Sequence, residues 1–313
     1  MYKAKFACDL HTHTSRSDGN DTCAELIDFA ASAGIEILAL TDHDITAPEV
    51  IETDGGAVSP ADYARSKNVI LLPGIEFSCD TLVEDVHIVA LGCDYTHPFF
   101  EVEFQNSIRS KIDGYRELCE ILTADGLKID WEKDILLGGQ RDENAVQRKH
   151  IFEAMAQKGY VPEWSDAKLL VKNSAKYEVK RKKPDPVDII QNIHTSGGIA
   201  ILSHPYLISE QVLLHGAPAS RAQYIDYLID AKLDGIEVSY PYDKTSYGGS
   251  LPVEQIEDEV RKLYSTRLPV LSGGSDYHNE GKKGSKNPRM LGECGCTKEY
   301  FMSTPLLRGL LAP

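Results

Sequence analysis

The sequence predicts an α/β barrel that carries an inserted helical segment. Two observations support this class. Six or seven short apolar segments, rich in β-branched residues, alternate with segments of helical periodicity, as in a parallel sheet that helices cover. The alternation stops between about residues 95 and 194, where only helical stretches occur. With 313 residues, 42% of them hydrophobic, the chain can bury a core of this size.

Four predicted strands precede the interruption: FACDLH, IEILALTDHD, VILLPGIEFS and DVHIVALGCDY. Between the first two, DTCAELIDFAASAGI has helical spacing, with Asp21 or Thr22 as its N-cap and Gly34 at its end. Between the second and third, SPADYARSKN is expected to be a helix, because Ser59 can cap it and Pro60 suits its first position.

The pattern resumes with the strands IAILSHP, DGIEVSY and LPVLSGGSDYH, separated by helices around residues 220–232 and 252–266. The intervening part is predicted to be helical at 100–124, 144–158 and 186–195. We therefore predict a barrel domain formed by residues 1–98 and 186–313, and an inserted helical subdomain formed by residues 99–185.

Composition restricts the classes of function. The net charge of −15 argues against a stable nucleic-acid partner and against an anionic membrane surface. No segment has the length and hydrophobicity of a membrane span or of a signal peptide, so a cytoplasmic protein is expected. The seven cysteines form no CxxC pair and are expected to be mostly buried thiols.

Polar residues cluster at the ends of the predicted strands. Six of the ten histidines lie on or just after these strands, most of them at the carboxyl end, where barrel enzymes build their sites. The pair His11 and His13 points two imidazoles to one side of an extended segment. The full set of nine is His11, His13, Asp18, His43, Glu76, His87, His204, Asp276 and His278.

Each of these residues alone has an ordinary structural explanation, as a hydrogen-bonded loop histidine or a helix cap. Together, two or three carboxylates packed at one topological position would repel one another and be costly to bury without cations. A polynuclear metal site explains the set better. Imidazole and carboxylate ligands without thiolates favour Mn²⁺, Fe²⁺ or Zn²⁺.

These motifs resemble the PHP family, named for polymerase and histidinol phosphatase. DLHTHTSRSDG, ALTDHD, GIEFS, HIVALG, ILSHP and GGSDYH are similar to its motifs and follow its order, over about residues 5–95 and 199–278. The resemblance implies a distorted (β/α)7 barrel and a trinuclear site. Because every ligand position is filled, it also implies an active, stand-alone enzyme and not a remnant that has lost its ligands.

By this resemblance, His11, His13, Glu76 and Asp276 would hold one metal ion. Glu76 would bridge to a second ion, which His87 and His204 would also hold, and Asp18, His43 and His278 would hold the third.

The implied chemistry is phosphate ester hydrolysis. Two metal ions about 3.5–4 Å apart can share a hydroxide that attacks phosphorus in line with the leaving oxygen. No Ser or Cys nucleophile is then required. The general acid is not evident from the sequence, with His150, Asp42 and water as the alternatives.

Basic residues point to an anionic substrate. The resemblance extends to an Arg-x-His pair on the inserted helices, matched by Arg148 and His150. Two basic segments, KNSAKYEVKRKK with Lys176 and EGKKGSKNPRM with Lys282 and Lys283, are further candidates. Most of the first segment is expected to be solvated surface, whereas the second follows two predicted metal ligands directly.

The leading hypothesis is therefore a metal-dependent phosphoesterase acting on a small, doubly phosphorylated sugar or nucleotide. The substrate would be a nucleoside 3′,5′-bisphosphate or a cyclic phosphate of ribose 5-phosphate. Alternatives are a histidinol-phosphate-type phosphomonoesterase and an oligonucleotide exonuclease. A C–N hydrolase is disfavoured because no lysine lies at a strand end, and a structural metal module because nine ligands leave positions open on three metal ions.

Overall fold

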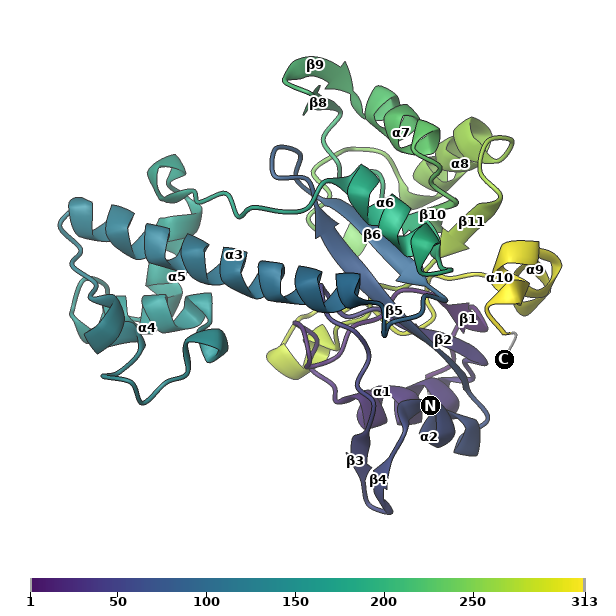
Figure 1. Ribbon diagram of the computed structural model, residues 1–313, viewed down its shortest axis with the longest axis horizontal. Helices are drawn as coiled ribbons and strands as arrows, with labels where there is room; N and C mark the ends of the chain where they lie inside the picture. Colours follow the sequence, from purple (N-terminus) through teal and green to yellow (C-terminus); the bar gives the residue numbers. More distant parts are fainter. Residues whose placement is uncertain (1, 312–313) are drawn as a thin grey trace. The chain divides into compact units, whose positions relative to one another are not determined.

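The computed structural model describes residues 2–311. By its internal contacts the chain divides into two compact units, one formed by Met1–Glu101 together with Pro184–Pro313 and one formed by Val102–Lys183 (Figure 1). The first contains every strand that the structure describes, and the second is helical.

A seven-stranded sheet forms the centre of the first unit. Its order is β1-β2-β5-β6-β7-β10-β11, and the sheet curves into a nearly closed barrel (Figure 1). Beyond the ends of β1 and β11, a parallel bridge joins Thr12 to Tyr277 and so links the two edges. The strands are Cys8–Asp9, Ile37–Leu40, Ile70–Cys79, Val86–Leu91, Ile199–Leu202, Gly235–Ser239 and Val270–Gly273.

This architecture confirms the predicted barrel class but corrects one strand direction. The sequence pattern indicated parallel strands throughout, whereas β6 runs antiparallel to both β5 and β7. The other sheet neighbours are parallel. An apolar run such as VHIVAL reads the same in either direction, so only the short connection after β5 distinguishes a hairpin from a βα crossover.

Helices cover the strands at the positions that the apolar periodicity of the sequence predicted. α1 (Cys23–Ala33) begins with a capping box between Thr22 and Glu25 and ends at Gly34 in the left-handed conformation. α2 (Pro60–Ser66) begins after Ser59, whose side chain accepts from Asp62 N. α6 (Pro186–Thr195) packs on β6 and β7, and α8 (Val253–Tyr264) packs on β10. The other α-helices that lie wholly within this unit are α7 (Arg221–Asp230), α9 (Lys298–Ser303) and α10 (Pro305–Gly309).

Two short hairpins were not predicted. β3 (Ile51–Thr53) pairs with β4 (Gly56–Val58), and β8 (Gln211–Leu214) pairs with β9 (Ala217–Ser220). Each strand is only three or four residues long and largely exposed, and the longest apolar run, residues 212–214 in β8, is too short to indicate a strand.

The second unit is built around its own apolar core. Its helices are most of α3 (Pro98–Ala124), α4 (Arg148–Gln157) and α5 (Trp164–Lys172), with a single π-helical turn at Trp131–Ile135. Among the described residues, none between 92 and 198 is in a strand, as the sequence predicted. The fully buried members of this core include Leu122, Ile135, Val146, Ile151, Met155 and Ala167.

Two further expectations concern the thiols and the membrane. All seven cysteines are free, and all but Cys93 are buried. Burial raises the pKa of Cys23, and of Cys119, to about 12, so these thiols are protonated at neutral pH. Within residues 2–311, no helix combines the length and the hydrophobicity that crossing a bilayer requires.

Candidate metal centre

Glu76 lies at the centre of the predicted ligands. It occupies the last third of β5 and is 1% exposed. Its Oε1 lies 3.1 Å from His11 Nε2, 3.1 Å from His204 Nε2 and 3.2 Å from His87 Nδ1. Three strands separated widely in sequence therefore bring three imidazoles to one carboxylate oxygen.

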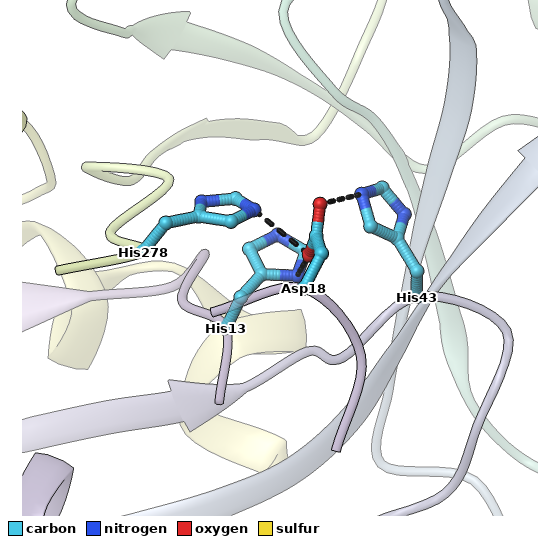
Figure 2. A group of neighbouring side chains, drawn as sticks. All are labelled: His13, Asp18, His43 and His278. Atoms are coloured by element: carbon cyan, nitrogen blue, oxygen red, sulfur yellow. Dashed lines mark hydrogen bonds and ion pairs between the residues drawn. The ribbon is translucent and has the colours of Figure 1, made fainter. Parts of the chain in front are cut away.

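The other oxygen of Glu76 faces a second group of predicted ligands. Oε2 lies 3.3 Å from His13 Nε2 and 3.2 Å from His43 Nδ1. Around Asp18, Figure 2 shows His13, His43 and His278 pointing toward the carboxylate, at 3.8, 3.9 and 3.0 Å respectively. One ligand atom from each of these four residues lies within 4.8 Å of the others, as in a metal site.

The barrel topology explains why these residues meet. The carboxyl ends of parallel strands share one edge, which positions His11, His43 and His204. His87 lies near the amino end of β6, opposite Ser78 of β5. Because β6 is reversed, its amino end is at the same edge as the carboxyl ends of its neighbours. The reversed direction of β6, which the sequence did not predict, is therefore what allows His87 to reach Glu76.

The loop after β11 lies directly against the first ligand. A Cβ at Gly274 would be 2.3 Å from Cβ of His11, so only glycine allows this approach. Asp276 N then donates to His11 O at 2.9 Å. These contacts hold Asp276 Oδ1 at 3.1 Å from His13 Nε2 and 3.6 Å from His11 Nε2.

The two oxygens of Asp276 have different partners. Oδ1 faces the imidazoles, including His278 Nδ1 at 3.3 Å. Oδ2 accepts from the hydroxyl of Tyr240 at 2.8 Å and from Nη1 of Arg289. Glu280 holds the same guanidinium, with 2.9 Å to Nε and 2.6 Å to Nη2. Asp276 therefore presents a single oxygen to the imidazole cluster.

The donor set fits divalent metal ions. Nδ1 of His13, His43 and His204 is buried and makes no hydrogen bond to the described residues, although carboxylate oxygens of Asp18 and Glu76 lie 3.8 Å from that of His13 and 3.2 Å from that of His43, respectively. A buried polar atom without a partner is costly, and a nitrogen lone pair in this position is suited to a cation. The mixture of imidazole and carboxylate, without thiolate, suits Mn²⁺, Fe²⁺ or Zn²⁺.

The pKa values of His11 and Glu76 describe the charges of the cluster when no metal ion is bound. Burial disfavours charge on His11, but the charges of Glu76, Glu237 and Asp276 outweigh it and raise the pKa of His11 well above its ordinary value. Burial would raise the pKa of Glu76, yet the imidazoles of His11, His43 and His87 hold it well below its ordinary value. Carboxylates here stay ionised and require positive charge beside them, which metal ions would supply.

A cavity of about 360 Å³ opens over the cluster. Cationic side chains on its wall are Lys244, which contacts Glu293 and donates to Pro288 O at 3.1 Å, and Arg289. Asp42, one predicted alternative for the general acid, is not among the lining residues. Its carboxylate is 1% exposed and accepts from Thr14 N, Thr14 Oγ1 and Ser17 Oγ, each at 2.7 Å, so it organises the loop that carries Asp18.

The predicted lysines lie on the surface of their units. Lys282 pairs with Asp21 at 2.6 Å and Glu25 at 3.1 Å, and neither it nor the exposed Lys283 lines the cavity over the cluster. Within the second unit, Lys176 pairs with Asp125 at 2.5 Å. From the basic segment after the last strand, it is Arg289 that reaches the cluster.

The remaining predicted substrate-binding residues, Arg148 and His150, lie in the first turn of α4 in the second unit. Arg148 is exposed and lies over the ring of Phe152, 5.9 Å from its centroid. His150 Nδ1 accepts from Gln147 N at 3.0 Å and so caps the helix. Their role toward a substrate stays a prediction.

Glu237 and Tyr240 are residues of the site that sequence reasoning missed, whereas Arg289 lies in the basic segment EGKKGSKNPRM that was already a candidate. The predicted site residues were polar residues at the ends of predicted strands, and Glu237 lies inside β10. A signal was present, since the GIEVS of β10 repeats the GIEFS that identified Glu76. A glutamate inside an apolar strand is itself unusual, because burying a carboxylate is costly without partners.

Comparison with known proteins identifies the family. The model of the PHP domain matches residues 9–177. A phosphoribosyl 1,2-cyclic phosphate 1,2-diphosphodiesterase of Eggerthella lenta is 27% identical over 87% of this chain and 94% of its own. A 5′-3′ exoribonuclease of Haemophilus influenzae and a 3′,5′-nucleoside bisphosphate phosphatase of Chromobacterium violaceum are each 29% identical over 63% of this chain, and over 68% and 66% of their own chains.

A solved structure shows the same fold. A chain from Bifidobacterium adolescentis, assigned as a metal-dependent phosphoesterase, superposes with a TM-score of 0.66 at 24% identity, over 97% of both chains. The family match spans more than half of the chain and includes the first six of the clustered ligands. Together with the clustered imidazoles and carboxylates, these findings show that the chain belongs to the PHP domain family and is a metal-dependent phosphoesterase.

Proposed function

We propose that the cluster holds three divalent metal ions and that the enzyme hydrolyses a phosphate ester of a small, doubly phosphorylated sugar or nucleotide. One observation carries the proposal: both oxygens of a single buried carboxylate, Glu76, face imidazole nitrogens at 3.1–3.3 Å. A carboxylate in this position can bridge two cations, which is what two-metal phosphoryl chemistry requires.

The proposed ligand groups are those that the resemblance to the PHP family implies. The contacts of Glu76 agree with them for His87 and His204 at Oε1 and for His13 at Oε2, whereas His11 lies at Oε1 and His43 at Oε2. His87 and His204 would share one ion with Glu76, and His11, His13 and Asp276 would share another with it. Asp18, His43 and His278 would hold the third. The contacts of Asp18 with the imidazoles of His43 and His278 support a separate third position.

When bound, these ions supply a Lewis acid for the phosphoryl oxygens and lower the pKa of water at the site. The chain supplies the geometry. Asp276 is fixed through one oxygen by Tyr240 and Arg289. Arg289 and Lys244 bring positive charge to the cavity wall, where they can orient the anionic substrate.

The proposed substrate class rests on the relatives and on the cavity. Two of the similar enzymes are named for substrates that carry two phosphate groups, a cyclic phosphate of a phosphoribosyl sugar and a nucleoside bisphosphate. A cavity of about 360 Å³ is at the small end of the size range of ligand sites. A phosphorylated metabolite suits it better than a large polymer.

The test is a panel of phosphate esters assayed for phosphate release with Mn²⁺. It should contain a nucleoside 3′,5′-bisphosphate, a cyclic phosphate of ribose 5-phosphate, histidinol phosphate and short RNA oligonucleotides. We expect the highest kcat/KM on one of the first two. Fastest turnover of histidinol phosphate would contradict the proposed substrate class.

A second candidate is stepwise cleavage of short RNA from its 5′ end, favoured by the similarity to the exoribonuclease. Ladders of shortened oligonucleotides at a higher kcat/KM than that of any small ester would replace the leading proposal with this one. The net charge of −15 disfavours a stable complex with long nucleic acid in either case.

A further inference from the structure

Glu237 is a buried carboxylate that the proposed ligand set does not use. It lies in the middle of β10, between β7 and β11, and is 2% exposed. A carboxylate in such a place destabilises the fold unless hydrogen bonds compensate its lost hydration. Its partners therefore indicate what it is for.

Both oxygens of Glu237 hold proposed metal ligands. His11 Nδ1 lies 3.2 Å from Oε1 and 3.4 Å from Oε2. The backbone N–H of His204 donates to Oε2 at 2.8 Å. These two histidines follow β1 and β7, which are not neighbours in the sheet, so β10 connects them through one side chain.

Each contact fixes a property that metal binding requires. A proton on His11 Nδ1, donated to Glu237, leaves the lone pair of His11 on Nε2, which lies 3.1 Å from Glu76 Oε1. His204 has a φ of 29°, in the left-handed region that non-glycine residues rarely adopt, and the bond to its N–H helps to hold it there.

We propose that Glu237 is a positioning residue of the metal centre, which sets the tautomer of His11 and the backbone of His204 before any ion binds. This inference rests on the metal centre proposed above. Carboxylates behind ligating histidines typically change metal affinity by about 10- to 100-fold when they are removed.

The chain contains a matched control next to the same strand. Asp234 directly precedes β10, and its Oδ2 lies 2.7 Å from His194 Nε2 and accepts from Ala200 N at 2.8 Å. Like Glu237, it therefore contacts one imidazole and one backbone N–H, but the N–H lies near the start of β7, whereas that of His204 lies after the end of β7. Neither of its partners is a proposed metal ligand.

The experiment measures Mn²⁺ affinity by competition with a chromophoric chelator in wild type, Glu237→Gln and Asp234→Asn. Thermal unfolding of the chelated proteins is recorded alongside. We expect Glu237→Gln to weaken Mn²⁺ binding by about 10- to 100-fold and to regain activity as Mn²⁺ is raised. Asp234→Asn should change unfolding but leave Mn²⁺ affinity at the wild-type value.

Wild-type affinity in Glu237→Gln, or an equal loss in Asp234→Asn, would overturn the inference while leaving the metal centre intact. A wild-type protein that binds no Mn²⁺ would instead overturn the metal centre and this inference with it. If Glu237→Gln does not fold, Glu237→Asp keeps the charge but withdraws the carboxylate by one methylene. It should then show the same loss of affinity, and wild-type affinity in that variant would count against the inference.

Discussion

Replacing Glu76 by glutamine should remove metal binding while retaining the fold. The amide has nearly the shape of the carboxylate but lacks its charge, and one of its two ends is a donor. Because Glu76 is 1% exposed, water cannot substitute for the lost charge. Removing one member of a buried charge pair costs about 3–5 kcal/mol. At about 1.4 kcal/mol per tenfold, Mn²⁺ affinity should fall by roughly 10²- to 10⁴-fold.

The assay compares Glu76→Gln with Glu259→Gln, which removes the same charge from α8. Glu259 accepts from the hydroxyl of Tyr206 at 2.8 Å and has no proposed ligand as a partner. Chelator competition should show weak Mn²⁺ binding in the first variant and wild-type binding in the second. Phosphate release should follow the same order. If Glu76→Gln bound Mn²⁺ as tightly as the wild type, Glu76 would not be a ligand.

Three further predictions concern the same site. Tyr240→Phe removes one of two donors to Asp276 Oδ2, so isothermal titration should show Mn²⁺ affinity lower by about tenfold or more, and an unchanged affinity would refute the positioning of Asp276. Protein freed of metal by a chelator should be most stable between about pH 4.5 and 6.5. The pKa of His11 is raised in the folded state, so the stability that its protonated form contributes is lost as pH rises above 6.5. The pKa of Glu76 is lowered in the folded state, so the stability that its ionised form contributes is lost as pH falls below 4.5. Urea unfolding across pH checks this, and a midpoint that rises steadily above pH 6.5 would contradict it. Arg148→Lys should lower kcat/KM on a nucleoside bisphosphate far more than on p-nitrophenyl phosphate, because only a guanidinium offers two-point contact to a second phosphate; equal losses on both would contradict that role.

The sequence predicted the barrel because its strands and helices differ in periodicity and are punctuated by specific caps. The capping residues Thr22 and Ser59 and the terminating Gly34 act through local hydrogen bonds and backbone conformation, so a few neighbours suffice to identify them. The direction of β6 leaves no trace in its apolar run, and only the short connection between β5 and β6 indicates a hairpin. The strands of the hairpins β3–β4 and β8–β9 are too short and too exposed to give a recognisable apolar pattern.

The clustering of the proposed ligands was predictable for a topological reason, and the residues that contact them from behind were not. In a barrel, residues after different strands converge at one edge, so His43 and His204 could be assigned to one site without coordinates. Glu237 and Tyr240 act on ligands from strand β10, and which ligand they contact depends on side-chain geometry. The same reason separates Arg289 from Lys282, since only the former turns toward Asp276.

Anomalous diffraction from crystals soaked in Mn²⁺ is the most direct test of whether Glu76 bridges cations within a trinuclear site. We expect two anomalous peaks, one beside each carboxylate oxygen of Glu76, and a third beside Asp18 and His278. Peaks that lie elsewhere, or a single peak with no contact to Glu76, would contradict it.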